Sequence, residues 1–291
     1  MSLLHYNFRS QQLGYYVNVT MALPTGDISY FDPETTDIPG MHQGQKNRKF
    51  VYKPGMKFQT LYLIHGGGDE DTLPYRLTNI ERFAEENKVL VVTPGIPNTF
   101  GADALYGVNY FSFVTEELPV IMQSLFNSSP KREDNFVAGY AMGGNVALGL
   151  AITRPDLYAA CVDISGGIGM TLDTDTMVEE LKGDHFRSNF YRFNATFGEA
   201  EDFPGSRHDL YPIAKKHKED GDELSDFIIV CGSEEFIRAR VEGDVAKLKE
   251  LEYPYRYIVM EGYDHNFPMW NDALEKTLNE WLPLKRTILY E

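Results

Sequence analysis

The segment spanning residues 137–144, Val-Ala-Gly-Tyr-Ala-Met-Gly-Gly, constrains the fold of this chain more than any other. An apolar run leads into Gly139, and a helix-forming run over residues 146–151 follows Gly143. Glycine allows close backbone approaches that other residues do not. The pattern therefore predicts a strand over residues 135–140, a sharp turn at Ala141 and a helix over residues 142–153.

Short apolar runs alternate with longer helical patterns along the rest of the chain. We predict further strands at residues 15–23, 61–64, 89–93, 159–164, 227–231 and 255–260, the first of them antiparallel. Helices are expected at residues 73–87, 113–126 and 271–281. Strands separated by helices are typical of an α/β fold, in which a mostly parallel central sheet is covered by helices on both faces.

Two stretches interrupt this alternation. Residues 27–58 are rich in Gly, Pro and polar residues, and we expect an elaborated hairpin loop there. Residues 166–226 carry helix fragments, many charges and five closely spaced aromatic residues: Phe186, Phe190, Tyr191, Phe193 and Phe197. A segment of this length inside a compact domain is often functional, so we predict a lid; a surface excursion with its own small core is the alternative. The sequence contains no repeat or low-complexity linker, so we expect a single domain over residues 1–291.

Composition limits the partners of the chain. A formal net charge of −16 argues against nucleic acid and against an anionic membrane, and favours a small-molecule partner. The sequence has no apolar window long enough to span a membrane and no signal peptide, so a cytoplasmic location is expected. Cys161 and Cys231 lie in apolar runs and are predicted to be buried free thiols. A homo-oligomer is compatible with this composition.

The turn at Ala141 matches the pattern G-x-S-x-G in all but one position. In that pattern a sharp strand-to-helix turn, the nucleophile elbow of an α/β-hydrolase, holds a serine hydroxyl above the sheet. Here alanine occupies the place of the serine. The sequence thus indicates a serine hydrolase scaffold that lacks the oxygen its chemistry requires.

Ester hydrolysis by a serine enzyme also requires a histidine base and a carboxylate that orients it. In this fold they follow the nucleophile in the order acid, then histidine. His265 follows the last predicted strand and precedes the last helix, which is where the base is expected. The acid is expected after the strand at 227–231, where Glu234 and Glu235 are adjacent. We favour Glu235, with Glu234 as the alternative.

Backbone N–H groups must stabilise the oxyanion that forms during the reaction. One is expected from Met142, the residue after the nucleophile position. The other is expected from the loop His65-Gly66-Gly67-Gly68, where we favour Gly67, with Gly68 as its neighbour. The acidic run at residues 69–71 argues against phosphate binding at this loop. The sequence contains no spacing typical of a zinc site, and no cofactor or metal is expected.

These stretches resemble the esterase D and tributyrin esterase group of α/β-hydrolases, which includes bacterial acetyl and feruloyl esterases. The resemblance rests on LIHGGGDEDT, TNIERFAEEN, YGVNYFSFVTEELP, KREDNFVAGYAMGGNVAL, CGSEEF and GYDH, and it covers residues 13–281. It implies a carboxylesterase acting without a cofactor on short-chain acyl or hydroxycinnamoyl esters, many of them carbohydrate-linked. It also implies a nucleophile at position 141, an acid at Glu235, a base at His265 and an oxyanion hole at Gly67 and Met142.

The chain departs from that family at two positions. The serine is Ala141, and the usual aspartate is Glu235. We interpret Ala141 as an inactivating serine-to-alanine change. A natural pseudoenzyme that binds an ester or a partner is an alternative, and so is a hydrolase using another nucleophile, such as Ser165, or a His265-activated water. A thioesterase for acylglutathione is a rival within the fold. Candidates for the substrate pocket are the aromatic residues of the 166–226 segment together with Gly68, Tyr110, Phe111 and Trp270.

Overall fold

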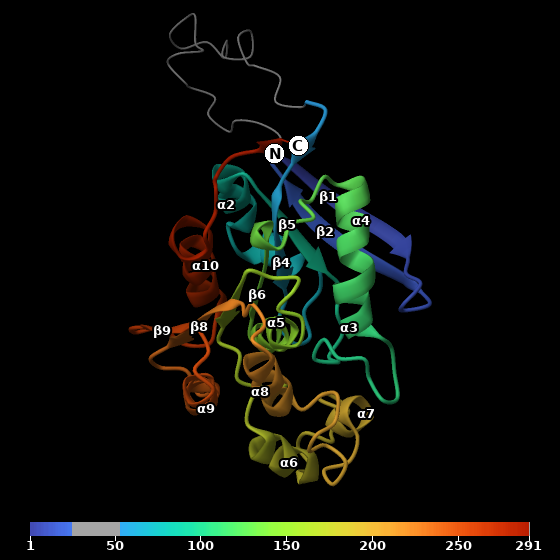
Figure 1. Ribbon diagram of the computed structural model, residues 1–291, viewed down its shortest axis with the longest axis vertical. Coiled ribbons are helices and arrows are strands. Elements are labelled where there is room, and N and C mark those ends of the chain that lie inside the picture. Colours follow the sequence, from blue (N-terminus) through green and yellow to red (C-terminus); the bar gives the residue numbers. More distant parts are fainter. Residues whose placement is uncertain (25–52, 291) are drawn as a thin grey trace, which may run out of the picture.

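The computed structural model describes residues 1–24 and 53–290 (Figure 1). Its centre is an eight-stranded sheet with the strand order β1-β2-β5-β4-β6-β7-β8-β9. The strands β4, β5, β6, β7, β8 and β9 are parallel, whereas β1 and β2 are antiparallel. The predicted α/β-hydrolase sheet is confirmed. The strands comprise β1 (Ser2–Arg9), β2 (Tyr16–Leu23), β4 (Gln59–Ile64), β5 (Val89–Pro94), β6 (Asn135–Tyr140), β7 (Ala160–Ile164), β8 (Asp226–Gly232) and β9 (Tyr255–Met260).

Helices cover both faces of this sheet and bury a separate apolar cluster on each. On one face the cluster includes residues from α4 (Leu118–Leu125), α5 (Met142–Thr153) and α9 (Arg238–Glu250). On the other face it includes residues from α2 (Ile80–Asn87), α10 (Phe267–Lys276) and the π-helix Thr277–Trp281. The parallel strands β4, β5, β6 and β7 are buried along their length, and such strands read as nearly continuous apolar runs in a sequence.

Helix α5 follows the predicted turn and is the most deeply buried helix of the fold. Every residue from Met142 to Ile152 is buried, and the helix contacts β4, β6 and β7. A helix that is apolar on all sides belongs in the interior of a domain. Burial of this kind fixes the position of its N-terminus, where Ala141 lies.

The strand predictions hold to within two residues at each end, but three strands were not predicted. Strand β1 pairs with β2 from Ser2↔Leu23 to Arg9↔Tyr16, and its side chains alternate between half-buried and exposed. The alternation of Leu4, Tyr6 and Phe8 with exposed residues marks this strand in the sequence, and the sequence analysis missed it. A short strand β3 (Met56–Lys57) pairs with β10 (Leu289–Tyr290) near the chain ends. Most of the hairpin loop expected at residues 27–58 lies outside the described residues.

Three helix predictions need correction. The helix expected at residues 73–87 is two helices, α1 (Leu73–Leu77) and α2, because Thr78 is extended and its hydroxyl bonds to the Pro74 carbonyl. The last helix begins at Phe267 rather than at residue 271, since the Asn266 side chain caps it by accepting from the Met269 N–H. The helix expected at residues 113–126 begins earlier and is not α-helical throughout. The short helix α3 (Tyr110–Ser112) is followed directly by a π-helix (Phe113–Glu117) and then by α4.

The segment at residues 166–226 contains three helices, α6 (Thr174–Lys182), α7 (Phe193–Phe197) and α8 (Leu210–Asp220), which lie together at one end of the molecule (Figure 1). Its aromatic side chains pack onto the body of the protein as well as onto each other. The ring of Phe193 lies 4.8 Å from that of Phe100, and α8 contacts α5. Cys161 and Cys231 are buried and free, as predicted.

Candidate active site

The turn between β6 and α5 has the sharp geometry that its glycines predict. A Cβ atom at Gly139 would lie 2.1 Å from the Gly143 carbonyl oxygen, and one at Gly143 would lie 2.1 Å from the Ile64 carbonyl oxygen. Both overlaps involve backbone atoms that cannot move aside. The two glycines are therefore required for the strand and the helix to approach this closely.

Ala141 lies at the tip of this turn in a conformation that is unfavourable for any residue with a side chain. Its backbone angles are φ 51° and ψ −126°, and its N–H donates to the Ile164 carbonyl at 3.0 Å. Non-glycine residues with positive φ are uncommon, and such strain concentrates at active sites. The elbow is thus formed as in a hydrolase, with a methyl group where a nucleophile would stand.

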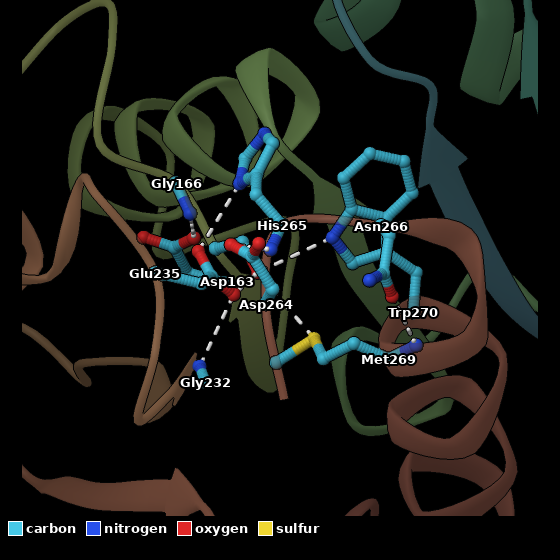
Figure 2. Close-up of polar contacts among 10 residues, drawn as sticks. Asp163, Gly166, Gly232, Glu235, Asp264, His265, Asn266, Met269 and Trp270 are labelled. Atoms are coloured by element: carbon cyan, nitrogen blue, oxygen red, sulfur yellow. Dashed lines mark hydrogen bonds and ion pairs between the residues drawn. The ribbon is translucent and has the colours of Figure 1, made fainter. Parts of the chain in front are cut away.

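Glu235 and His265 are brought together from different loops (Figure 2). The His265 Nδ1 lies 3.1 Å from Glu235 Oε2, and the Glu235 side chain is fully buried. The other carboxylate oxygen, Oε1, accepts from the Gly232 N–H at 3.1 Å. Glu234, by contrast, is exposed and accepts from the Ser233 hydroxyl. Of the two adjacent glutamates, the structure places Glu235 against the histidine.

The His265 ring is held between two aromatic side chains. The Trp270 ring lies 5.1 Å from it at 89°, and the Phe236 ring lies 5.3 Å away at 64°. Edge-to-face contacts of this kind favour one orientation of the ring. With Nδ1 directed to Glu235, Nε2 is the nitrogen left for a reacting group in the cavity that His265 lines.

The glycine loop after β4 faces the N-terminus of α5. A Cβ atom at Gly67 would lie 3.6 Å from Met142 Cβ, so the two predicted oxyanion donors are neighbours. Met142 is the first residue of α5, and the first N–H groups of a helix have no partner within it. The N–H of Gly68 instead donates to Asn98 Oδ1 at 2.9 Å. That bond favours Gly67 over Gly68 as the second donor.

His65 anchors the same loop from beneath. Its Nε2 accepts from the Ile96 N–H at 3.0 Å, which requires a neutral ring nitrogen. Burial lowers the pKa of His65 below its usual value, so the ring stays neutral and keeps this bond. The loop position therefore does not depend on the protonation of this histidine near neutral pH.

A cavity of about 220 Å³ lies between the glycine loop, the elbow and His265. Four predicted site residues line it, namely Gly67, Ala141, Met142 and His265, together with two aromatic residues of the 166–226 segment, Phe190 and Tyr191. The sequence analysis missed its remaining lining residues, which are Asn98, Phe100, Ser165 (considered only as another nucleophile), Gly167, Ile168, Phe236 and Ile237. Phe236 could have been found, because it directly follows the acid in the sequence.

Seven predicted pocket residues are not part of this lining: Gly68, Tyr110, Phe111, Trp270 and the segment aromatics Phe186, Phe193 and Phe197. The Tyr110 hydroxyl bonds to that of Tyr15, and its ring packs against Phe113 within the core. Phe111 lines a separate cavity beside α8, and Gly68 is exposed, with a Cβ at its position 4.0 Å from the Phe190 ring. Trp270 is buried behind His265 and stacks on the Tyr140 ring at 4.7 Å. The prediction that these residues line the substrate pocket is therefore wrong for this cavity.

Comparisons with known proteins agree with this geometry. A model of the family described as "Putative esterase" matches residues 45–281. The chain belongs to this esterase family.

Among the described residues no cluster of His, Cys, Asp or Glu could hold a metal ion, and no helix is long and apolar enough to cross a membrane.

Individual relatives of this esterase are ester and thioester hydrolases. An acetyl esterase from Caldicellulosiruptor saccharolyticus is 25% identical over 253 residues, which are 80% of this chain and 89% of that protein. An S-formylglutathione hydrolase from Bos taurus is 28% identical over 172 residues, which are 56% of this chain and 53% of that protein. The substrate-bound structure of FphF, a fluorophosphonate-binding serine hydrolase of Staphylococcus aureus, has a TM-score of 0.76 at 26% identity and covers 97% of this chain and 98% of its own. The scaffold is that of a carboxylic ester hydrolase.

Proposed function

We propose that this esterase is a serine carboxylesterase for short-chain acyl esters in which alanine has replaced the nucleophile at position 141. The observation that carries the proposal is the strained elbow at Ala141, which lies in the same cavity as the His265–Glu235 pair. Glycine would relieve that strain, yet a residue with a side chain is kept there. On this proposal the site lacks only one oxygen atom.

With serine at position 141, the reaction would follow the usual acyl-transfer steps. His265 Nε2 would take the hydroxyl proton as the oxygen attacks the ester carbonyl, and the N–H groups of Gly67 and Met142 would hold the oxyanion. The imidazolium would then return the proton to the departing alcohol, leaving an acyl-enzyme. Water activated by His265 would release the acid, while Glu235 keeps the ring in the correct tautomer.

The alanine form lacks this pathway. Removing the serine of a well-studied protease lowers turnover about a millionfold, while binding groups remain in place. We therefore expect the chain as it stands to bind esters and to hydrolyse them almost not at all. A natural pseudoenzyme that uses this binding is the second candidate, because the site residues around Ala141 are intact.

The cavity supports a small acyl group. Its volume of about 220 Å³ is below the 300–1,000 Å³ of pockets that bury drug-sized ligands. Phe190 and Phe236 are 54% and 74% exposed at its rim, where a larger alcohol or aromatic ring could stack. A hydroxycinnamoyl ester would need this rim for its ring, so we rank acetyl-type esters first.

An acylglutathione substrate is less well supported. Its tripeptide leaving group carries carboxylates, and a site for it requires cationic partners. Among the described residues that line the cavity, none is Lys or Arg. The acidic residues at positions 69–71 follow the glycine loop directly. We therefore place neutral esters ahead of the thioester.

We also propose that the 166–226 segment acts as the lid of the cavity, through Phe190 and Tyr191, which line it.

Hydrolysis of p-nitrophenyl acetate, butyrate and octanoate, methyl ferulate and an acylglutathione by Ala141→Ser tests the proposal. We expect turnover to be greatest with acetate and to be lost when His265→Ala is added. If Ala141→Ser hydrolyses none of them while the unchanged chain binds an ester tightly, the pseudoenzyme is the better explanation. Fast turnover by the unchanged chain would refute the role of position 141.

A further inference from the structure

Ser165 lies beside the catalytic pair and has a positive φ angle similar to that of Ala141 in the elbow. It follows β7 as Ala141 follows β6, and its φ is 59° where that of Ala141 is 51°. The Ser165 N–H donates to the Val230 carbonyl of the neighbouring strand at 2.8 Å. Positive φ disfavours every residue with a side chain, so the surrounding structure must hold Ser165 in this conformation.

The Ser165 hydroxyl has its single proton directed at the carboxylate. Ser165 Oγ lies 2.5 Å from Glu235 Oε1 and 3.5 Å from the Met269 sulfur. The Trp270 indole N–H donates to the same hydroxyl oxygen at 3.2 Å. An indole nitrogen is only a donor, so it occupies a lone pair of Ser165 and leaves the hydroxyl proton for Glu235.

Glu235 is thereby fixed at both oxygens. Oε1 accepts from the Ser165 hydroxyl and from the Gly232 N–H. Oε2 faces His265 Nδ1 (Figure 2). A glutamate has one more rotatable bond than an aspartate, and a buried carboxylate is costly unless its oxygens are bonded. Two donors on one oxygen hold the longer side chain in the single pose that reaches the imidazole.

We infer that Ser165 is a positioning residue, which acts through Glu235 and is itself oriented by the Trp270 indole N–H. The inference rests on the proposed function, because it assigns Glu235 as the acid of a triad. It also answers whether Ser165 could replace the missing nucleophile. Ser165 is fully buried, and its proton points to the acid rather than to the base, so it is not a substitute for position 141.

The first test measures hydrolysis of p-nitrophenyl acetate in the Ala141→Ser background. Ser165→Ala should lower kcat roughly tenfold, as expected for losing a hydrogen bond to a charged group, and should leave KM within about twofold. Trp270→Phe, which keeps the ring and removes only the N–H, should lower kcat by less. Because Ser165 acts through Glu235, Ser165→Ala should cost little further once Glu235→Gln is present. Full additivity of the two losses would overturn the inference.

A second readout does not need activity. In the unchanged chain, the His265 Nδ1 proton that faces Glu235 should give a downfield proton resonance, which Ser165→Ala should shift or broaden. Lys249→Ala, at an exposed position on α9, is the control and should leave the resonance unchanged. If Ala141→Ser is inactive but the resonance responds to Ser165→Ala, the proposed function fails and the positioning role stands. A resonance that Ser165→Ala leaves unchanged in a folded protein overturns the positioning role.

Discussion

The elbow geometry makes a sharp prediction about two glycines that both lie in helices. Gly143 is the second residue of the buried helix α5, and Gly243 lies within α9. A Cβ atom at Gly143 would lie 2.1 Å from the Ile64 carbonyl oxygen and 2.6 Å from that of His65, whereas one at Gly243 would meet nothing within 4 Å. Gly143→Ala and Gly243→Ala therefore add the same methyl group in opposite surroundings.

The sizes of the two effects follow from these contacts. Relief of the overlap at Gly143 requires the end of β4 to move by about an ångström, and forced overpacking costs typically 1–3 kcal/mol, more where backbone must shift. We expect Gly143→Ala to lower the free energy of unfolding by at least about 3 kcal/mol. Gly243→Ala should raise it by about 0.5–1 kcal/mol, because alanine favours a helix interior.

Urea denaturation followed by tryptophan fluorescence measures both changes against the parent chain. The two midpoints should move in opposite directions, by a difference equivalent to about 4 kcal/mol. In the Ala141→Ser background, Gly143→Ala should also abolish esterase turnover, while Gly243→Ala should leave it intact. If the free energy of unfolding of Gly143→Ala lies within about 1 kcal/mol of the parent value, β4 and α5 do not approach each other as closely as described.

Three further predictions concern the elbow, the rim and a buried histidine. Ala141→Gly should raise the free energy of unfolding by about 1 kcal/mol in urea denaturation, since it relieves the positive φ; a loss would contradict the strain argument. In the Ala141→Ser background, Phe190→Ala should raise KM for naphthyl acetate roughly fivefold and leave methyl acetate unchanged; equal effects on both would exclude stacking at the rim. Burial, with Arg207 beside it, lowers the pKa of His208 to about 4. Unfolding between this pH and about 6.5 therefore binds a proton to this histidine. The free energy of unfolding should fall as pH drops from about 6.5 toward 4, by at most about 1.4 kcal/mol per pH unit. Denaturation at pH 5 and 7.5 should show this fall in the parent, and His208→Gln should reduce it; an equal fall in both would assign it to other groups.

The sequence predicted the parts of the fold that depend on local pattern. Continuous apolar runs marked the buried parallel strands, and the glycines at 139 and 143 marked the turn because no other residue fits there. The half-exposed strand β1 was missed although Leu4, Tyr6 and Phe8 alternate along it, because no continuous apolar run marks a strand that is buried on one face only. The boundary of α10 was missed because Asn266 acts as its cap through a side-chain bond, which a pattern of apolar residues does not register.

The site was predictable in part for a similar reason. His265 and Gly67 follow from their order along the chain, because strands of a parallel sheet deliver their loops to one edge. The sequence favoured Glu235 but left Glu234 open, since adjacent residues differ only in direction; the structure places Glu235 Oε2 3.1 Å from His265 Nδ1. Trp270 was expected in the pocket and lies behind the histidine instead, where its indole N–H bonds to Ser165. Aromatic composition alone does not distinguish a pocket wall from a second layer of packing.

The central claim is that the site lacks only the nucleophile at position 141. Intact-mass and peptide analysis after treatment with a fluorophosphonate reagent tests it most directly, because such reagents label an activated serine and need no choice of ester. Ala141→Ser should gain one covalent adduct on the peptide containing residue 141, the unchanged chain should gain none there, and His265→Ala should slow the labelling strongly. If Ala141→Ser stays unlabelled while folded, the elbow and the His265–Glu235 pair do not form an acyl-transfer site.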